Sequence, residues 1–214
     1  MKRHKKIATS LTALAVAAAG AWTTHQHQQP EQTPSGSPPP KQINTAQLAD
    51  LRIAPENPDK GYKRSDFGDW RSTGHGCNTR ATILQNTGQN VRTTERCRVT
   101  SGSWYSAYDG KSVSSANQLD IDHLVPLQEA YRSGADHWSR QQREDYANDP
   151  LVLVPVSKTS NRSKGDRDPD SWRPSNHSSW CENAKRWITI KERYDLSADA
   201  AEEAALSDML RTCP

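Results

Sequence analysis

The chain has 214 residues, of which 28 are Lys or Arg and 25 are Asp or Glu, a formal net charge of +3 at pH 7. The first 21 positions hold no acidic residue and four of the basic ones, Lys2, Arg3, Lys5 and Lys6, so the rest of the chain has 24 basic against 25 acidic residues. Overall basicity is therefore excluded as an argument for a nucleic-acid partner, and attraction for phosphate must come from local clusters.

The first 43 residues carry the signals of export followed by a linker. A basic start (MKRHKK) precedes an Ala-rich apolar run with small residues near its end, the pattern of a cleaved signal peptide over 1–21. A membrane anchor is the alternative, but the run is shorter than the ~20 residues that a spanning helix needs. Residues 22–43 are rich in Gln, Pro and Ser and predict a disordered linker. Residues 44–214 have the length of one domain.

Helix and hairpin signals come next along the chain. Residues 45–53 predict a short helix, and residues 78–88 predict a second one that Gly88 ends. Polar and apolar residues alternate in 97–105 and 111–115, on either side of an Asp-Gly pair, which indicates a β-hairpin. We expect these two strands to extend the sheet formed by the apolar run that follows.

Asp122 and His123 lie side by side in that apolar run, which is too short for a buried helix and predicts a strand that ends at Pro126. Successive residues of a strand point to opposite faces of the sheet. The two side chains can therefore share a site only at a strand end or a bend.

A second strand and a short helix are predicted after a helical connector over 127–149, which is split at Gly134. The run LVLVPV at 151–156 predicts the strand. Ser157 is the expected N-cap of the helix, and Gly165 is its expected end. The predicted order of these elements is therefore strand, strand and helix.

This order of elements is expected to bring two oxygen ligands for a metal and one general base close together. A hard divalent cation prefers oxygen ligands, which the carboxylate of Asp122 and the amide of Asn161 supply. His123, with an unperturbed pKa of ~6.5, is suited to take a proton from water. Each motif alone is common and has a plain structural explanation, as a chance pair, a turn or the start of a helix. Their occurrence together indicates a metal-dependent hydrolytic site.

Four cysteines remain after the expected leader, at positions 77, 97, 181 and 213. An even number in an exported chain implies disulfides. Of the three possible pairings we favour Cys77–Cys97 and Cys181–Cys213, because each joins neighbours in sequence. A structural zinc site is the alternative, which the absence of any C-x-x-C weakens.

Two helices are expected at the carboxyl end of the chain. The last begins at Asp199, where Asp199 and Glu202 have the spacing of a capping box, and ends at Cys213. The one before it places four residues on a single face at helical spacing, which predicts a core stripe: Cys181, Ala184, Trp187 and Ile188.

The residues DHLVPL, followed by ND, a β-type run and NRSKGD, resemble those of the HNH endonucleases, most closely a secreted actinobacterial branch. The resemblance covers most of residues 61–213. It implies an α+β fold with a ββα-metal core, a small antiparallel sheet and surrounding helices, tied by disulfides.

The resemblance also suggests roles. His123 would be the general base, and Asp122 and Asn161 would hold Mg²⁺, for which Mn²⁺ could substitute. Asn148 would fix the loop and the orientation of His123. Arg80, in a GC-x-TR element, would point to the scissile phosphate, with a surface ion pair as its alternative. Three basic residues would contact phosphate, unless they form a solvated face: Lys158, Arg162 and Lys164.

The expected protein is a secreted, monomeric endonuclease that cleaves DNA, with RNA as a second candidate substrate, to 5′-phosphate and 3′-hydroxyl ends. No recognition helix, finger or arm is evident, so recognition through the backbone without sequence preference is expected. No stable membrane association is expected after cleavage of the leader. The alternatives are a zinc hydrolase, disfavoured because no H-E-x-x-H occurs, and a non-catalytic binding module.

Overall fold

The computed structural model describes residues 48–214. The expected signal peptide and linker lie outside these residues, as does the first part of the helix expected over 45–53. That helix does not extend to residue 53, because Leu51 lies in a bend and Ile53 forms a parallel β-bridge with Ala198. No helix within residues 48–214 has both the length and the apolar character that crossing a membrane requires.

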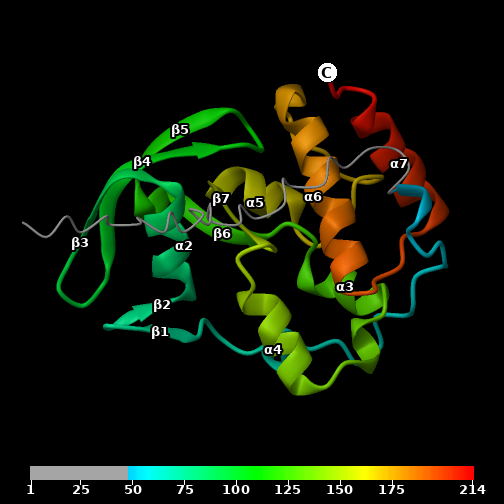
Figure 1. The fold of residues 1–214 in the computed structure, drawn as a ribbon, viewed down its shortest axis with the longest axis horizontal. Helices are drawn as coiled ribbons and strands as arrows, with labels where there is room; N and C mark the ends of the chain where they lie inside the picture. Colours follow the sequence, from blue (N-terminus) through cyan, green and yellow to red (C-terminus); the bar gives the residue numbers. More distant parts are fainter. Residues whose placement is uncertain (1–47) are drawn as a thin grey trace, which may run out of the picture. The chain divides into compact units, whose positions relative to one another are not determined.

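The strands form three small antiparallel sheets (Figure 1). The bounds are β1 (Ser72–Gly74) with β2 (Cys77–Asn78), β3 (Gln89–Thr93) with β4 (Val99–Ser106) and β5 (Lys111–Ser115), and β6 (Leu119–His123) with β7 (Leu153–Ser157). The predicted hairpin is confirmed as β4 and β5.

The expectation that this hairpin extends the sheet of Asp122 is wrong. A 3-10 turn, η2 (Ala116–Gln118), redirects the chain between β5 and β6, and within residues 48–214 β6 pairs only with β7. The two sheets instead meet through side chains, since Trp104 of β4 packs in one cluster with Leu119 and Ile121 of β6.

The predicted order of strand, strand and helix is present. β6 and β7 pair in unbroken register from Leu119 opposite Ser157 to His123 opposite Leu153. The helix α5 (Lys158–Lys164) begins at the next residue, and the Ser157 hydroxyl caps it by accepting the amide proton of Ser160 at 3.3 Å. Gly165 ends the helix at φ +62°, a conformation that favours glycine. The helix α5 therefore begins at the opposite end of the β6–β7 pair from His123, and its last residue, Lys164, returns to Asp122.

Helices pack on both sides of the unit formed by β6, β7 and α5: α2 (Thr79–Thr87), α3 (Leu127–Arg132), α4 (Arg140–Asn148), α6 (Trp180–Arg193) and α7 (Ala200–Leu210). The remaining turns are η1 (Arg64–Phe67), η3 (Ala135–His137) and η4 (His177–Ser179). Asn78 caps α2 and Asp199 caps α7, as predicted. The capping box at Asp199 is only half formed, because the Glu202 side chain is buried against Trp187 and Lys191 instead.

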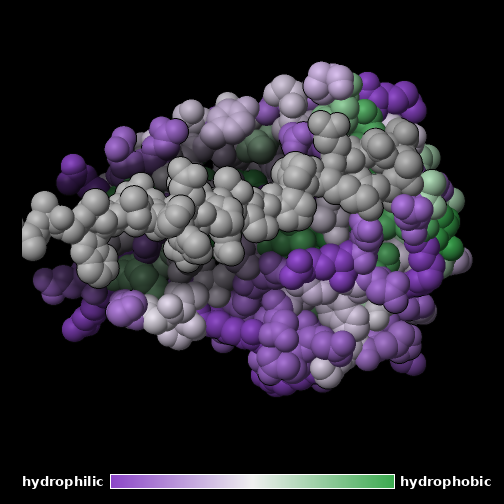
Figure 2. All heavy atoms as spheres, in the orientation of Figure 1, coloured by the Kyte–Doolittle hydropathy of each residue, from purple (hydrophilic) through white to green (hydrophobic). Residues whose placement is uncertain are grey.

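Two apolar cores flank the pair β6–β7. One joins α3, α4, α6 and α7, and it receives Val154 and Val156 from β7. The other lies between α2 and the three-stranded sheet, and it receives Leu119, Ile121 and Leu153. The predicted stripe on α6 is confirmed, since all four of its residues are buried. The outer face of α4, by contrast, lies in a hydrophilic region of the surface (Figures 1 and 2).

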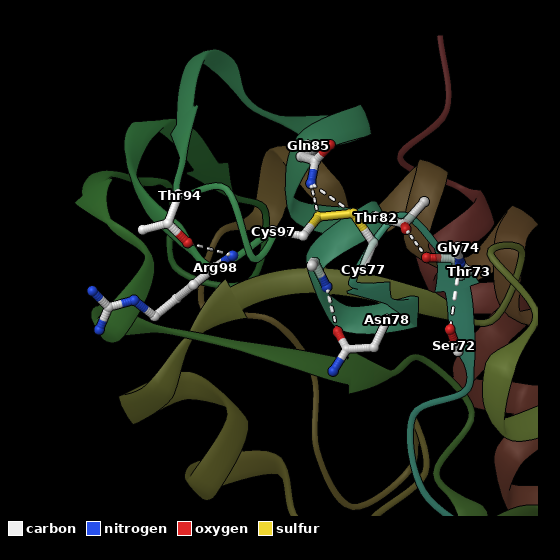
Figure 3. The surroundings of a disulfide bond; sticks show 11 residues. Ser72, Thr73, Gly74, Cys77, Asn78, Thr82, Gln85, Thr94, Cys97 and Arg98 are labelled. Atoms are coloured by element: carbon white, nitrogen blue, oxygen red, sulfur yellow. Dashed lines mark hydrogen bonds between the residues drawn. A yellow bond between two sulfur atoms is a disulfide. The ribbon is translucent and has the colours of Figure 1, made fainter.

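Both predicted disulfides are present. Cys77–Cys97 ties β2 to the turn between β3 and β4 (Figure 3), and Cys181–Cys213 ties α6 to the segment after α7. All four cysteines are therefore paired, which excludes the structural zinc site. The observed fold is a mixed α+β domain with small antiparallel sheets and two disulfides.

Candidate active site

The structure brings Asp122, His123 and Asn161 to one open cavity of about 230 Å³. Asp122 and His123 are the last two residues of β6, and the strand end lets both reach the cavity although they start from opposite faces. Asn161 comes from the middle of α5. Tyr62 and Arg64, from the loop around η1, complete one wall. No second histidine lines the cavity, which removes the basis for a two-histidine zinc site there.

His123 is held as a neutral ring with one free nitrogen. Its Nε2 lies 3.0 Å from the carbonyl oxygen of Ala147, which can only accept, so Nε2 carries the proton and Nδ1 keeps its lone pair. The indole of Trp70 stacks on the ring at 5.6 Å and 11°. Burial lowers the pKa of His123 from 6.5 to about 4. This shift favours the neutral ring near neutral pH.

Asn148 makes no hydrogen bond to His123 but anchors the groups that hold it. Its Oδ1 accepts from the backbone N–H of Arg71 at 2.9 Å and from the hydroxyl of Thr79 at 2.6 Å. Its Nδ2 donates to the carbonyls of Asp69 and of Glu144 at 3.2 and 3.0 Å. These bonds bracket Trp70 and fix the end of α4, whose Ala147 carbonyl binds the imidazole. The geometry thus agrees with the indirect role expected for Asn148.

Asp122 is paired with Lys164, and this corrects one expectation. The Oδ2 of Asp122 accepts from Lys164 Nζ at 2.8 Å and from the hydroxyl of Tyr108 at 2.7 Å, and Nζ also donates to the carbonyl of His123 at 3.0 Å. Lys164 is only 1% exposed, so it cannot contact a phosphate at the surface. Burial lowers the pKa of Lys164, and the Asp122 carboxylate opposes that shift. The pair fastens α5 to the end of β6.

The donor atoms around the cavity fit a hard divalent cation. Asn161 donates from Nδ2 to Asp120 Oδ2 at 3.1 Å, which leaves its Oδ1 as an acceptor. Within residues 48–214, neither this atom nor Asp122 Oδ1 has a hydrogen-bond partner. Two uncommitted oxygens, one from a carboxylate and one from an amide, are donors that Mg²⁺ or Mn²⁺ accepts.

Arg80 does not lie in this cavity. Its Nη2 donates to the carbonyls of Ala116 and Leu119, both at 3.1 Å, at the opposite end of β6 from His123. The structure therefore does not bring Arg80 into the cavity of His123, because two carbonyls hold its Nη2 elsewhere. Arg80 also forms no ion pair within residues 48–214, so the surface ion pair named as its alternative is not present.

The two remaining basic residues of the prediction lie on α5 outside the cavity of His123. Arg162 is exposed one residue after Asn161. Lys158 is half-buried at the start of the helix and lines a neighbouring cavity with Lys111.

Sequence reasoning missed four groups around the cavity: Trp70, Tyr108, Arg64 and the carbonyl of Ala147. Trp70 ends the segment GYKRSDFGDW and stacks on the imidazole. The other three carry no local signal, because their relevance arises only from tertiary contacts.

Residues 78–209 match the family described as "GmrSD restriction endonucleases, C-terminal domain". The chain belongs to this family. The matched residues of this GmrSD-type domain include Arg80, Asp122, His123 and the whole of α5, whereas Tyr62 and Arg64, which also line the cavity, precede the match. This finding places the chain in a nuclease family, as the resemblance to endonucleases implied.

A fungal relative is also similar to this GmrSD-type domain. An uncharacterized secreted protein of Arthroderma benhamiae is 44% identical over 188 residues, which cover 85% of this chain and 92% of that protein. This relative is fungal, so it does not show the narrower resemblance to a secreted actinobacterial branch. No solved structure matches the chain.

Proposed function

We propose that the protein is a secreted, metal-dependent endonuclease of the HNH type that hydrolyses phosphodiester bonds without sequence preference. One observation carries the proposal: a neutral histidine with a free Nδ1 shares a cavity with two uncommitted oxygen donors. The family supports it, since its description names restriction endonucleases.

His123 acts as the general base. Its Nδ1 takes a proton from water as the water oxygen forms a bond to phosphorus and the bond to the 3′-oxygen breaks. A second water protonates the leaving 3′-oxyanion, which gives a 5′-phosphate and a 3′-hydroxyl. The Ala147 carbonyl and the Trp70 indole hold the ring in one orientation and one tautomer during the transfer. The Ala147 carbonyl accepts the hydrogen bond from Nε2–H both before and after the step, so the imidazolium keeps this hydrogen-bond partner.

Asp122 and Asn161 would hold one Mg²⁺ through their Oδ1 atoms, and Mn²⁺ could substitute. When bound, the cation neutralises negative charge on the phosphate and on the leaving oxygen. Lys164 keeps Asp122 in place while it occupies only Oδ2. Two protein ligands leave most of an octahedral shell to water and substrate, as suits a cation that dehydrates reluctantly.

The substrate proposed is DNA, with RNA as a second candidate, bound through its backbone. Arg162, exposed beside Asn161, is positioned to contact a phosphate, and Lys158 adds charge one turn earlier. The proposed location is extracellular and the proposed state monomeric, with 1–21 as the signal peptide and 22–43 as the linker. The printed name of the fungal relative, a secreted protein, agrees with export.

Cleavage of supercoiled plasmid by the purified mature protein, with Mg²⁺ or with EDTA, tests the proposal. His123→Ala is expected to lower the rate by about 10²–10⁴-fold, the usual contribution of a general base. His137→Ala is the matched control, because the His137 side chain is 82% exposed on η3. Near wild-type turnover by the His123 variant, or full activity in EDTA, would contradict the proposal.

A further inference from the structure

A second cavity, of about 290 Å³, lies beside the Cys77–Cys97 disulfide and is lined by three arginines. Arg80 forms its inner wall, and Arg96 and Arg98 form its rim. No acidic residue lines the cavity, and within residues 48–214 none of the three arginines forms an ion pair. Two carboxylates lie near the cavity. Asp120 accepts from Asn161 and opposes, through its charge, the lowering of the pKa of Arg80 by burial, and Glu95 lines a neighbouring hollow together with Arg96 and Arg98. Three guanidinium groups thus stand against two carboxylates, and the cavity keeps an excess of positive charge.

The disulfide fixes the positions of the rim arginines. Arg96 and Arg98 flank Cys97 in the turn between β3 and β4, where Cys97 has a φ of +58°. Thr94 closes this turn, since its carbonyl accepts from Cys97 N–H at 2.9 Å and its hydroxyl accepts from Arg98 N–H at 3.2 Å. Figure 3 shows the turn with the Arg98 side chain extending away from the disulfide. The guanidinium groups thus start from a rigid backbone and end in solvent.

Arginines without acidic partners bind phosphate well, because the planar guanidinium matches two phosphate oxygens. The inner arginine is also preorganised, since two carbonyls hold Arg80 in place. A phosphate in this cavity would meet one half-buried and two exposed guanidinium groups.

The cavity connects with the candidate active site along β6. Asn117 lines both the arginine cavity and the next one, which contains Lys111 and Lys158. Lys158 starts α5, whose Asn161 lines the cavity of His123. The five-residue strand β6 spans ~13 Å between its ends. Because a duplex strand rises ~3.4 Å per nucleotide along the axis and also winds around it, this distance corresponds to fewer than about four nucleotides of one strand.

We propose that Arg96 and Arg98, together with Arg80, form a second phosphate-binding site that holds the nucleic-acid backbone within about four nucleotides of the scissile bond. The site binds a polymer, because its phosphate must belong to the same strand that reaches His123. This inference rests on the proposed function for its substrate class.

Salt-dependent binding of a short fluorescent DNA duplex tests the inference. The parent protein is the full mature chain with His123→Ala, which prevents cleavage during the titration. Arg96→Gln with Arg98→Gln is expected to weaken binding about 10- to 100-fold near ~0.1 M salt and to reduce the slope of log K against log salt by about 2, since each phosphate contact contributes ~0.9. Arg96→Lys with Arg98→Lys is expected to restore most of the slope.

The matched control is Arg52→Gln with Arg211→Gln. Both residues are exposed and lie outside the cavities described above, so the net charge changes equally while the parent's affinity and slope are expected to persist. A pocket variant that binds like this control would overturn the inference. A nucleoside monophosphate is titrated in parallel, and if it binds the parent as tightly as the duplex does, the site serves free nucleotides and the inference fails.

The outcomes separate this inference from the proposed function. Pocket-dependent binding by a protein that does not cleave plasmid would leave the second site standing and refute the nuclease. If the wild type cleaves plasmid but the Arg96 and Arg98 variants bind the duplex like the control, the nuclease function stands and the second site is refuted. A parent that does not bind the duplex at any salt concentration overturns the second site directly.

Discussion

Asn148 makes four hydrogen bonds that bracket Trp70 and the end of α4, and both of these contact His123. A side chain of this kind does not touch the reacting atoms. We propose that it fixes which nitrogen of the imidazole carries the proton, because the Ala147 carbonyl stays in place only if α4 ends where it does.

Asn148→Ala is expected to lower the free energy of unfolding by at least about 2 kcal/mol, because several hydrogen bonds worth ~1 kcal/mol each are lost. Cleavage should fall as well, without a change in the Mg²⁺ concentration at half-maximal rate. Urea unfolding and a metal titration of plasmid cleavage measure both effects. Asn86→Ala, at an exposed position of α2, is the control. A shifted metal requirement would show that Asn148 acts on the cation instead.

Asn161→Ala is expected to change the Mg²⁺ requirement of cleavage and to affect stability little, the opposite of Asn148→Ala. Loss of the amide oxygen removes one of two proposed protein ligands, so more Mg²⁺ is needed for half-maximal cleavage, while the fold loses only the bond to Asp120. Calorimetric titration with Mn²⁺ gives a readout that does not depend on turnover. If Asn161→Ala kept the metal dependence and the Mn²⁺ affinity of the wild type, Asn161 would not be a ligand.

Lys164 shows why single residues are hard to assign from sequence. A lysine on a short polar helix is expected at the surface, because lysines are rarely buried without a partner. Its partner, Asp122, precedes it by 42 positions and lies on a different element. The motif correctly brought Asp122, His123 and Asn161 to one cavity, but which of them faces Lys164, Tyr108 or Asp120 depends on packing that no local pattern encodes.

Among the elements, those with a strong local signal were predicted and those formed by pairing alone were not. The strand β6, the strand β7 and the helix α5 all carry apolar runs or caps that fix their limits. The strand β3 was missed, because its sequence QNVRT is almost entirely exposed and has no alternation. It is a strand only because β4 pairs with it. The separation of the hairpin from β6 was missed for a similar reason, since a three-residue turn decides it.

The two disulfides should differ in what their loss does. Cys181→Ala with Cys213→Ala removes a link across 32 residues between α6 and the chain end, and it is expected to cost about 2–4 kcal/mol of stability while duplex binding persists. Cys77→Ala with Cys97→Ala removes a link across 20 residues and should cost a similar amount. It should also weaken binding, because Arg96 and Arg98 lose their anchored turn. Urea unfolding and the duplex titration measure these effects, and equal binding by both variants would contradict the distinction.

At the scale of the whole molecule, one buried ionic cluster joins three helices. Lys191 of α6 donates to Glu129 of α3 at 2.8 Å and to Glu202 of α7 at 2.6 Å, and all three are at most 1% exposed. Although burial alone would raise the pKa of Glu129, the Lys191 ammonium lowers it to about 2. Burial raises the pKa of Glu202 from 4.5 to about 7. The Lys191 ammonium thus pairs with both Glu129 and Glu202, and of these two carboxyl groups Glu202 has the pKa near neutrality.

Stability should therefore depend on pH through Glu202. The native state keeps a proton that the unfolded chain has released above pH 4.5, so the stabilisation is present at low pH and is lost as the pH rises through about 7. Glu202→Gln should reduce this slope by at most about 1.4 kcal/mol per pH unit, and Glu56, whose pKa burial also raises to about 7, accounts for the rest. Urea unfolding at several pH values compares it with wild type and with Glu203→Gln, the partly exposed neighbour. A slope in Glu202→Gln as steep as that of the wild type would refute the assignment.

The two buried lysines have a practical consequence for following the molecule in solution. Lys164 and Lys191 are 1% and 0% exposed, whereas the other lysines between residues 48 and 214 keep part of their side chains in water. Brief acetylation of the native protein should therefore modify every other amine in that range first, as peptide mass spectrometry can measure. Lys164 then reports opening of the cavity beside β6, and Lys191 reports separation of α3, α6 and α7. A condition that loosens one half of the domain before the other would appear as the order in which these two amines become reactive.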